Sequence, residues 1–145
     1  MLAKVPPKRN DGKSSFKSLQ KYMEERDVID PNTGEVIGWE KDSVSVQTNC
    51  LDRDTAWREM LAVADMNGRV KDPVYHVTLN WQEGENPTDE QAFEAARKAM
   101  KAVGMEDHQY VAAVHRDTDN VHVHLMVNRV HPDTYKAVYP DRDYF

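Results

Sequence analysis

The strongest constraint on the fold is a short stretch in which apolar and polar residues alternate. Between residues 121 and 128 every second residue is apolar, and His122 and His124 occupy positions in between. A period of two predicts a half-buried strand, so these two histidines point to the same side of it. Turn-forming residues at 117–120 precede this strand, and an apolar run at 110–114 precedes the turn. The pattern predicts two antiparallel strands joined by a tight turn.

Three histidines belong to this predicted hairpin. His115 lies at the end of the first strand, across the turn from His122 and His124. Directly opposed residues of an antiparallel pair have Cβ atoms roughly 4.5–5.5 Å apart, so the three imidazoles can converge. A single histidine on a strand is usually a surface or satisfied core residue, but three on one face favour a divalent-metal site with open positions. The spacing alone leaves zinc, manganese, iron, nickel and copper open, and also magnesium where a substrate supplies oxygen ligands.

Length and cysteine content define the broad class of protein. A chain of 145 residues predicts one domain with a single core. No apolar run approaches the roughly 18 residues that a membrane-spanning helix needs, and the N-terminus lacks the apolar core of a secretory signal. The single cysteine, Cys50, excludes an internal disulfide framework and fits a reducing compartment.

The charge is distributed unevenly along the chain. The net charge of −6 argues weakly against a nucleic-acid partner. The first 21 residues are nevertheless strongly basic, because one acid, Asp11, stands among Lys4, Lys8, Arg9, Lys13, Lys17 and Lys21. This segment could contact phosphates, or it could be a solubilising leader, and charge alone leaves both readings open.

Local patterns predict the remaining elements. We expect a helix from Ser14 or Ser15 to Arg26, a hairpin over 28–37 and a strand over 44–48. A second helix follows from Asp54 or Thr55 to Asn67, and then a strand over 73–81. The sequence Thr88-Asp-Glu-Gln91 is a capping box that opens a third helix, ending at Gly104. The expected order is strand, helix, hairpin, strand, helix, strand, helix, strand, strand. It predicts an α+β fold with a largely antiparallel sheet, helices on one face and the histidines on the other, open face.

A metal beside a sheet needs a reacting partner, and Tyr22 is one candidate. It lies on the first predicted helix, inside the basic segment. A phenol with a pKa near 10 is a weak nucleophile at neutral pH unless a metal or an imidazole assists it. More commonly, such a tyrosine packs its ring against apolar neighbours and leaves its hydroxyl in contact with solvent. The residue pattern alone does not select Tyr22 over Tyr135, Tyr139 or Tyr144.

One motif carries a family resemblance. The sequence His115-Arg-Asp-Thr-Asp-Asn-Val-His-Val-His124 resembles the three-histidine motif of plasmid relaxases, which belong to the HUH endonuclease superfamily. Its flanks, Glu-Asp-His-Gln-Tyr-Val before it and Val-Asn-Arg-Val-His-Pro after it, resemble the P-type mobilisation relaxases, most closely those of IncI-like conjugative plasmids.

Two other segments resemble further motifs of these relaxases. The stretch Lys-Arg-Asn-Asp-Gly-Lys-Ser-Ser-Phe, followed by Leu19 and Tyr22, resembles the motif that carries the nucleophilic tyrosine. The strand Pro-Val-Tyr-His-Val-Thr-Leu-Asn-Trp resembles the second motif. The similarity covers residues 3–25 and 73–133, and the segment between them is less diagnostic.

The resemblance implies a DNA relaxase domain over residues 1–145, with an HUH relaxase palm. The chain ends without a stop signal for its last segment, so we expect it to be an N-terminal fragment of a longer protein. Such an enzyme nicks one strand at a plasmid origin of transfer during conjugative mobilisation. By this resemblance Tyr22 would attack the scissile phosphodiester, leaving a 5′-phosphotyrosyl bond and a free 3′-hydroxyl. A divalent ion, Mg²⁺ or Mn²⁺, would be held by His115, His122 and His124, while Asp117 would orient His115.

The resemblance also implies contacts with DNA and with other proteins. The DNA contacts expected are Lys4, Lys8, Arg9, Lys13 and Asn80. Asn80 stands where these relaxases usually have a serine near the cleaved phosphate, and His76 on the same strand face is expected to be structural rather than a fourth ligand. The expected partners are single-stranded DNA at the origin of transfer, an accessory relaxosome DNA-binding protein and a type IV coupling protein. We expect a cytoplasmic, plasmid-encoded bacterial protein without membrane insertion.

Three other functions compete with this interpretation. An HUH replication initiator would share the histidines, but its tyrosine would follow them in the chain, as Tyr135 and Tyr139 do and Tyr22 does not. A metal-dependent DNA hydrolase would use water and form no covalent intermediate. A non-catalytic DNA-binding module would use a metal for stability alone.

Overall fold

The computed structural model describes residues 1–6, 15–29, 31–33, 35–40, 44–116 and 119–140. Its elements follow the predicted order of strands and helices. In chain order they are β1 (Leu2–Lys4), α1 (Phe16–Glu24), β2 (Arg26–Ile29), β3 (Val36–Glu40), β4 (Ser45–Thr48), α2 (Ala56–Asp65), β5 (Val74–Asn80), α3 (Asp89–Ala102), β6 (Tyr110–His115) and β7 (His122–Asn128).

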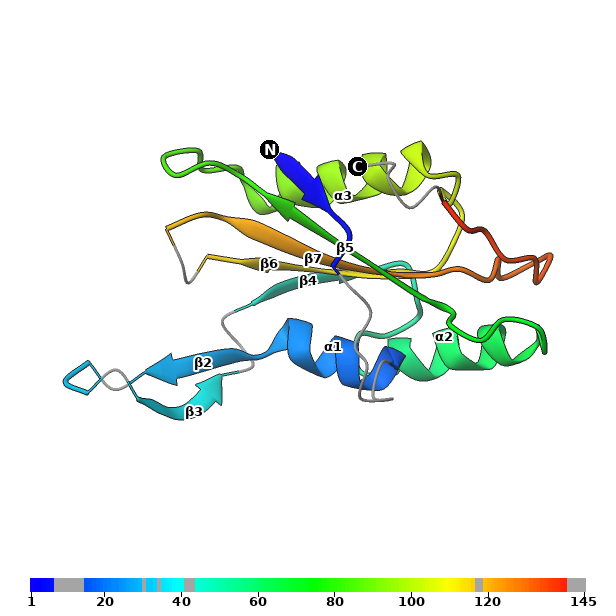
Figure 1. Ribbon diagram of the computed structural model, residues 1–145, viewed down its shortest axis with the longest axis horizontal. Coiled ribbons are helices and arrows are strands. Elements are labelled where there is room, and N and C mark those ends of the chain that lie inside the picture. Colours follow the sequence, from blue (N-terminus) through cyan, green and yellow to red (C-terminus); the bar gives the residue numbers. More distant parts are fainter. Residues whose placement is uncertain (7–14, 30, 34, 41–43, 117–118, 141–145) are drawn as a thin grey trace.

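The main sheet has five strands in the order β1-β5-β7-β6-β4, and every neighbouring pair is antiparallel. Strands β2 and β3 form a separate hairpin that projects beyond the end of α1 (Figure 1). The histidine-bearing strand β7 is therefore central, with β5 on one side and β6 on the other. This confirms the predicted α+β fold and its antiparallel sheet.

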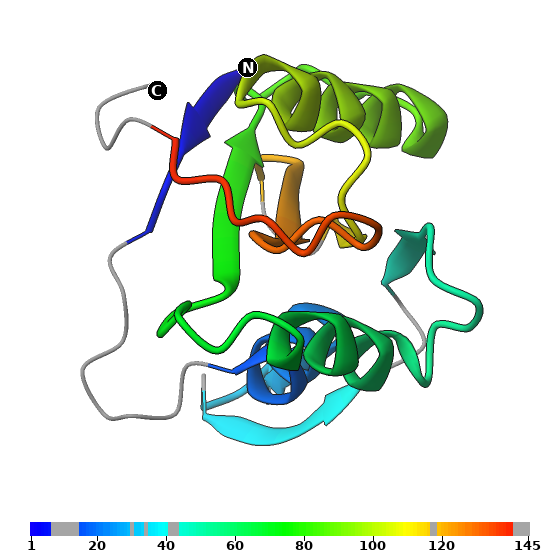
Figure 2. The same cartoon turned by 90° about the vertical axis from the view of Figure 1, so that its right-hand side faces the viewer.

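Helices cover both faces of this sheet. Helix α3 lies on one face, whereas α1 and α2 lie on the other (Figures 1 and 2). The expectation that all helices share one face, leaving the histidine face open, is wrong. The apolar run that contains Val111 and Ala112 explains the difference, because these neighbours point to opposite faces and are both fully buried. A strand that is apolar on both sides needs cover on both sides.

Two apolar clusters hold these layers together. The first joins α3 to the sheet through residues such as Phe93, Met100 and Leu125. The second joins α1 and α2 to the opposite face through residues such as Phe16, Met60 and Met126. Fully burying a side chain of this size contributes about 1.5–3 kcal/mol relative to leaving it exposed. The second cluster fixes α1 against the histidine-bearing face of the sheet.

Side-chain caps define where two of the helices begin. The Thr88 hydroxyl accepts a hydrogen bond from the Gln91 backbone N–H, and the Gln91 side chain returns one to Thr88, as the capping box predicts. Ser15 and Ser18 form the equivalent box at the start of α1. Each cap stabilises its helix by about 1 kcal/mol. Helix α1 ends at Glu24, two residues before the predicted end, because the chain enters β2 at Arg26.

Candidate functional site: a histidine cluster facing the N-terminal helix

The hairpin register brings the three predicted histidines together. His115 pairs directly with His122, and Ala113 pairs with His124. The ring centroids of His115 lie 5.0 Å from those of His122 and 5.1 Å from those of His124, and the last two are 5.3 Å apart. The three imidazoles therefore form one compact cluster at the end of the sheet beside α1.

Desolvation keeps the His124 ring and its neighbour His76 uncharged. Desolvation, reinforced by the neighbouring His76, His115 and His122 rings, lowers the pKa of His124 to about 3. Desolvation likewise lowers the pKa of His76 to about 4. Both rings are therefore neutral at neutral pH, and a neutral imidazole is the form that can ligate a metal ion.

Hydrogen bonds orient each ring. The Nδ1 atom of His124 lies 3.1 Å from Nε2 of His76, and Nδ1 of His122 lies 3.3 Å from the carbonyl oxygen of Asn120. His115 donates from Nε2 to the carbonyl oxygen of Met23 over 2.5 Å. A carbonyl oxygen accepts only, so Nδ1 of His122 and Nε2 of His115 each carry the proton.

The imidazole nitrogens of the cluster suit a divalent metal, although the three rings are not arranged as a complete set of metal ligands. Within the described residues, no group of three or more His, Cys, Asp or Glu side chains is arranged as a metal site. The Nε2 atom of His115 contacts the Met23 carbonyl oxygen. Three imidazoles of which at least one is held neutral nevertheless match the nitrogen donors that first-row divalent ions accept. Asp117, predicted to orient His115, lies outside the described residues.

Tyr22 stands beside this cluster. Its ring centroid is 5.5 Å from that of His124, in an edge-to-face arrangement, and 58% of the residue is exposed. Phe16 and Met23 belong to the apolar side of α1 and are buried, whereas Tyr22 lies at the edge of that side and is exposed. The helix therefore presents a solvent-accessible phenol next to the histidines.

The other tyrosines considered for the nucleophile lie elsewhere. Tyr135 and Tyr139 belong to the segment after β7, and the Arg129 guanidinium lies 5.2 Å from the centre of the Tyr139 ring. Tyr144 lies outside the described residues. Geometry therefore favours Tyr22, a choice that the residue pattern alone did not make.

A buried polar network fixes the helix that carries Tyr22. Gln20 donates from Nε2 to Glu24 Oε1 over 3.0 Å and to the Arg53 carbonyl oxygen over 2.7 Å. Arg53 Nε donates to the same Glu24 oxygen over 3.0 Å. Gln20 and Glu24 are 4% and 5% exposed, so these bonds are shielded from water. The network joins α1 to the chain just before α2.

The predicted DNA contacts are placed only in part. Lys4 is exposed at the end of the edge strand β1, opposite Thr78. Asn80 pairs with His122 across β5 and β7, so it lies on the histidine side of the sheet. Lys8, Arg9 and Lys13 lie outside the described residues.

His76 has a closer relation to the site than the sequence indicated. It lies on the same face of β5 as Asn80 and contacts His124 directly. The sequence shows that His76 and Asn80 share a strand face. It does not show which face of the sheet that is, because a helix precedes β5 and another follows it, and either could cover that face. Pairing with β7 decides the question.

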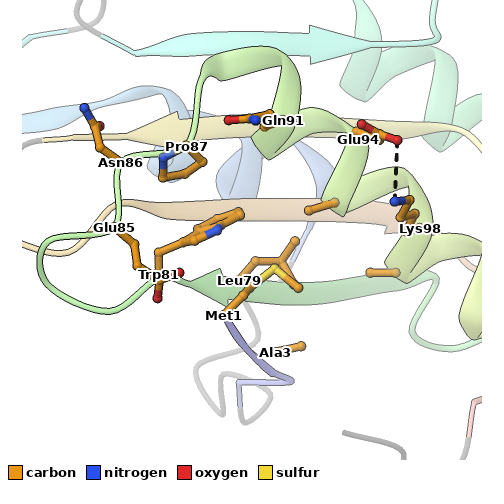
Figure 3. A pocket seen from close by; sticks show the side chains of 12 residues that line it. Met1, Ala3, Leu79, Trp81, Glu85, Asn86, Pro87, Gln91, Glu94 and Lys98 are labelled. Carbon is orange, nitrogen blue, oxygen red and sulfur yellow. Dashed lines mark ion pairs between the residues drawn. The ribbon is translucent and has the colours of Figure 1, made fainter.

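A groove of about 750 Å³ lies on the other side of the sheet, between β1, β5 and α3. Figure 3 shows Leu79 and Trp81 beside α3 in this groove, with the ion pair between Glu94 and Lys98 at its edge. Its lining comes from the α3 face, so it is separated from the histidine cluster by the sheet.

Known proteins resemble this chain over most of its length. Residues 29–145 match the model of the relaxase family described as the MobA/VirD2-like nuclease domain. Protein MobA of Acidithiobacillus ferrooxidans is 47% identical over 79 residues, covering 54% of this chain and 19% of that protein. Two TraI proteins of Escherichia coli are each 32% identical, covering 98% and 99% of this chain and 19% of their own length.

These matches cover only part of each related protein. The chain spans about a fifth of the length of these relatives. No solved structure is significantly similar to it. The family match begins after Tyr22, whereas the two TraI alignments include helix α1. In the part of the chain that the structure describes, no helix has both the length and the apolar character to cross a membrane. The match over residues 29–145 shows that this chain belongs to the family of MobA/VirD2-like relaxase nuclease domains.

Proposed function

We propose that this domain nicks one DNA strand at a plasmid origin of transfer by tyrosine transesterification, as a step in conjugative mobilisation. The observation that carries the proposal is the contact between Tyr22 and the histidine cluster, with ring centroids of Tyr22 and His124 5.5 Å apart. Family membership supports DNA nicking as the type of reaction, and the position of the phenol supports Tyr22 as its nucleophile.

In the proposed reaction the Tyr22 hydroxyl oxygen attacks the scissile phosphorus. A phosphorus–oxygen bond forms to the tyrosine, the bond to the 3′-oxygen of the preceding nucleotide breaks, and that oxygen takes up a proton as the phenol loses one. The products are a 5′-phosphotyrosyl bond and a free 3′-hydroxyl. Because one phosphodiester replaces another, the reverse reaction can rejoin the strand.

The three histidines have a positioning and electrostatic role in this proposal. A divalent ion, Mg²⁺ or Mn²⁺, would polarise the non-bridging phosphate oxygens when it is bound. His115, His122 and His124 would hold it, and the low pKa of His124 keeps that ring in the ligand-competent form. Asp117 remains a predicted orienting residue for His115.

The substrate would be single-stranded DNA that passes along the histidine side of the sheet. Asn80 lies beside His122 on this side and can form hydrogen bonds to DNA near the cleaved phosphate. The basic residues Lys4, Lys8, Arg9 and Lys13 would contact the backbone, so binding should weaken with increasing salt. The accessory relaxosome protein, the coupling protein and a cytoplasmic location are part of the same proposal.

A covalent adduct tests the proposal. The protein would be incubated with single-stranded oligonucleotides that tile the replicon encoding it, with Mg²⁺ or Mn²⁺ or with a chelator, and resolved by denaturing electrophoresis. We expect a metal-dependent protein–DNA adduct that is lost in Tyr22→Phe. Tyr139→Phe is the matched control, because Tyr139 is similarly exposed, at 63%, but lies in the segment after β7.

Each other outcome points to a different function. An adduct that persists in Tyr22→Phe and disappears in Tyr139→Phe would indicate the arrangement of a replication initiator. Cleavage without an adduct would indicate a hydrolase that uses water. DNA binding that is unchanged by Tyr22→Phe, with neither cleavage nor adduct from any oligonucleotide, would indicate a binding module.

A further inference from the structure

His76 is a half-buried neighbour of the histidine cluster that the proposed reaction does not use. It pairs with Met126 across β5 and β7, whereas Thr78, two residues later on β5, pairs with His124. Its ring lies 5.3 Å from that of His124 with an interplanar angle of 31°, and its Nε2 is 3.1 Å from His124 Nδ1. These two rings are joined by a side-chain hydrogen bond between the neighbouring strands β5 and β7.

The hydrogen bond restricts where the protons can be. In a pair of neutral imidazoles, one nitrogen donates and the other accepts. If His124 donates from Nδ1, its lone pair is on Nε2 and His76 carries its own proton on Nδ1. If His124 instead accepts at Nδ1, its Nε2 carries a proton and cannot bind a metal.

The position of His76 favours its acting through His124. Met126, which pairs with His76, belongs to the apolar cluster beneath α1 and α2, so His76 lies on the core side of His124. The Nε2 atom of His76 is already engaged by His124. Ligating histidines in metal sites commonly use their second nitrogen in this way, donating to a neighbouring group that fixes tautomer and ring orientation.

We propose that His76 is a positioning residue: it accepts the Nδ1 proton of His124 and thereby keeps the lone pair of His124 on Nε2. The tautomer assignment concerns the protein itself, whereas its consequence for metal affinity rests on the proposed function of the cluster. Loss of such an outer partner typically costs about 10- to 100-fold in metal affinity.

Two readouts test this role without relying on activity. Long-range ¹H–¹⁵N NMR of the metal-free protein reports which nitrogen of His124 carries the proton, and titration calorimetry with Mn²⁺ reports affinity. His76→Leu removes the acceptor. His76→Gln keeps an acceptor oxygen close to the original Nε2 position. Thr78→Val is the matched control, because Thr78 lies on the same strand face, directly opposite His124.

We expect wild-type protein and Thr78→Val to show His124 protonated on Nδ1 and to bind Mn²⁺ alike. His76→Leu should shift the proton toward Nε2 and weaken Mn²⁺ binding about 10- to 100-fold, and His76→Gln should restore both. Circular dichroism checks folding. If His76→Leu does not fold, His76→Asn, whose shorter side chain places its amide away from His124 Nδ1, takes its place.

Two results would overturn the proposal. One is an unchanged His124 tautomer in the folded variant that lacks the acceptor. The other is an equal loss of Mn²⁺ binding in His76→Leu and His76→Gln although His76→Gln restores the tautomer, which would make His76 a direct ligand. Wild-type protein that binds no Mn²⁺ would contradict the proposed metal site instead, and the tautomer measurement would still decide the role of His76.

Discussion

His115 donates a hydrogen bond from Nε2 to the backbone carbonyl of Met23 over 2.5 Å, which ties the central hairpin to helix α1. Both residues are buried, at 6% and 0% exposure, and 92 positions separate them in the chain. Met23 directly follows Tyr22, so this contact sets where the phenol lies relative to the histidines. The hydrogen bond thus links the histidine cluster to the helix that carries Tyr22.

Metal removal should therefore stop the reaction and leave the fold intact. With excess EDTA we expect adduct formation to disappear while thermal unfolding stays cooperative, because two clusters of buried apolar side chains join the helices to the sheet. Electrophoresis and circular dichroism on the same samples provide the measurement. Loss of cooperative unfolding in EDTA would instead indicate a structural metal.

Removal of either capping box should destabilise the protein by a similar amount. Ser15→Ala and Thr88→Ala each delete a hydroxyl that accepts a backbone N–H at the start of a helix, so each should lower the free energy of unfolding by about 1 kcal/mol. Urea unfolding gives both values. Only Ser15→Ala should also slow adduct formation, because α1 carries Tyr22; equal rates for the two variants would contradict this link.

The pair formed by Arg53 and Glu24 should contribute more to stability than a surface ion pair. Arg53→Ala leaves the Glu24 carboxylate, whose side chain is 7% exposed, with Gln20 as its remaining partner in the network. We expect a loss of about 1.5–3 kcal/mol, the range for hydrogen bonds to charged groups. Lys98→Ala is the control, since its pair with Glu94 is largely exposed and should contribute about 0–1 kcal/mol. Similar urea midpoints for both variants would show that the network is dispensable.

Protonation of His108 should destabilise the fold as pH falls. Burial is the main cause that lowers the pKa of His108 below its usual 6.5, with His131 adding to the effect while the Asn128 carbonyl and Asp107 oppose it. The neutral ring is favoured in the folded state, so its contribution is complete above about pH 6.5 and is lost as pH falls toward the lower, folded-state pKa.

His108→Asn isolates this contribution. The asparagine amide can still donate to the Asn128 carbonyl, which His108 Nδ1 contacts at 2.6 Å, but it does not titrate. Urea unfolding at pH 5, 6 and 7 should show a smaller loss of stability at low pH for the variant than for the wild type. Parallel pH dependences would assign the acid sensitivity to other groups, such as His76 and His124, whose pKa values are also lowered.

Much of the fold follows from local patterns in the sequence. The alternation around His122 and His124, the turn formers before them and the Thr88 capping box act over a few residues, so the hairpin and α3 could be predicted. The three histidines could be placed on one face for the same reason, because side chains two apart in a strand point to the same side.

Tertiary structure decided what covers that face and what reaches it. Period-two alternation does not reveal that α1 packs over the histidine side, that His76 faces His124 or that Met23 engages His115, since these depend on pairing between segments far apart in the chain. The sequence by itself determined the hairpin and its histidines, through short-range periodicity. Only the packing of β5 and α1 against β7, driven by burial of residues such as Phe16 and Met126, placed Tyr22 and His76 beside them.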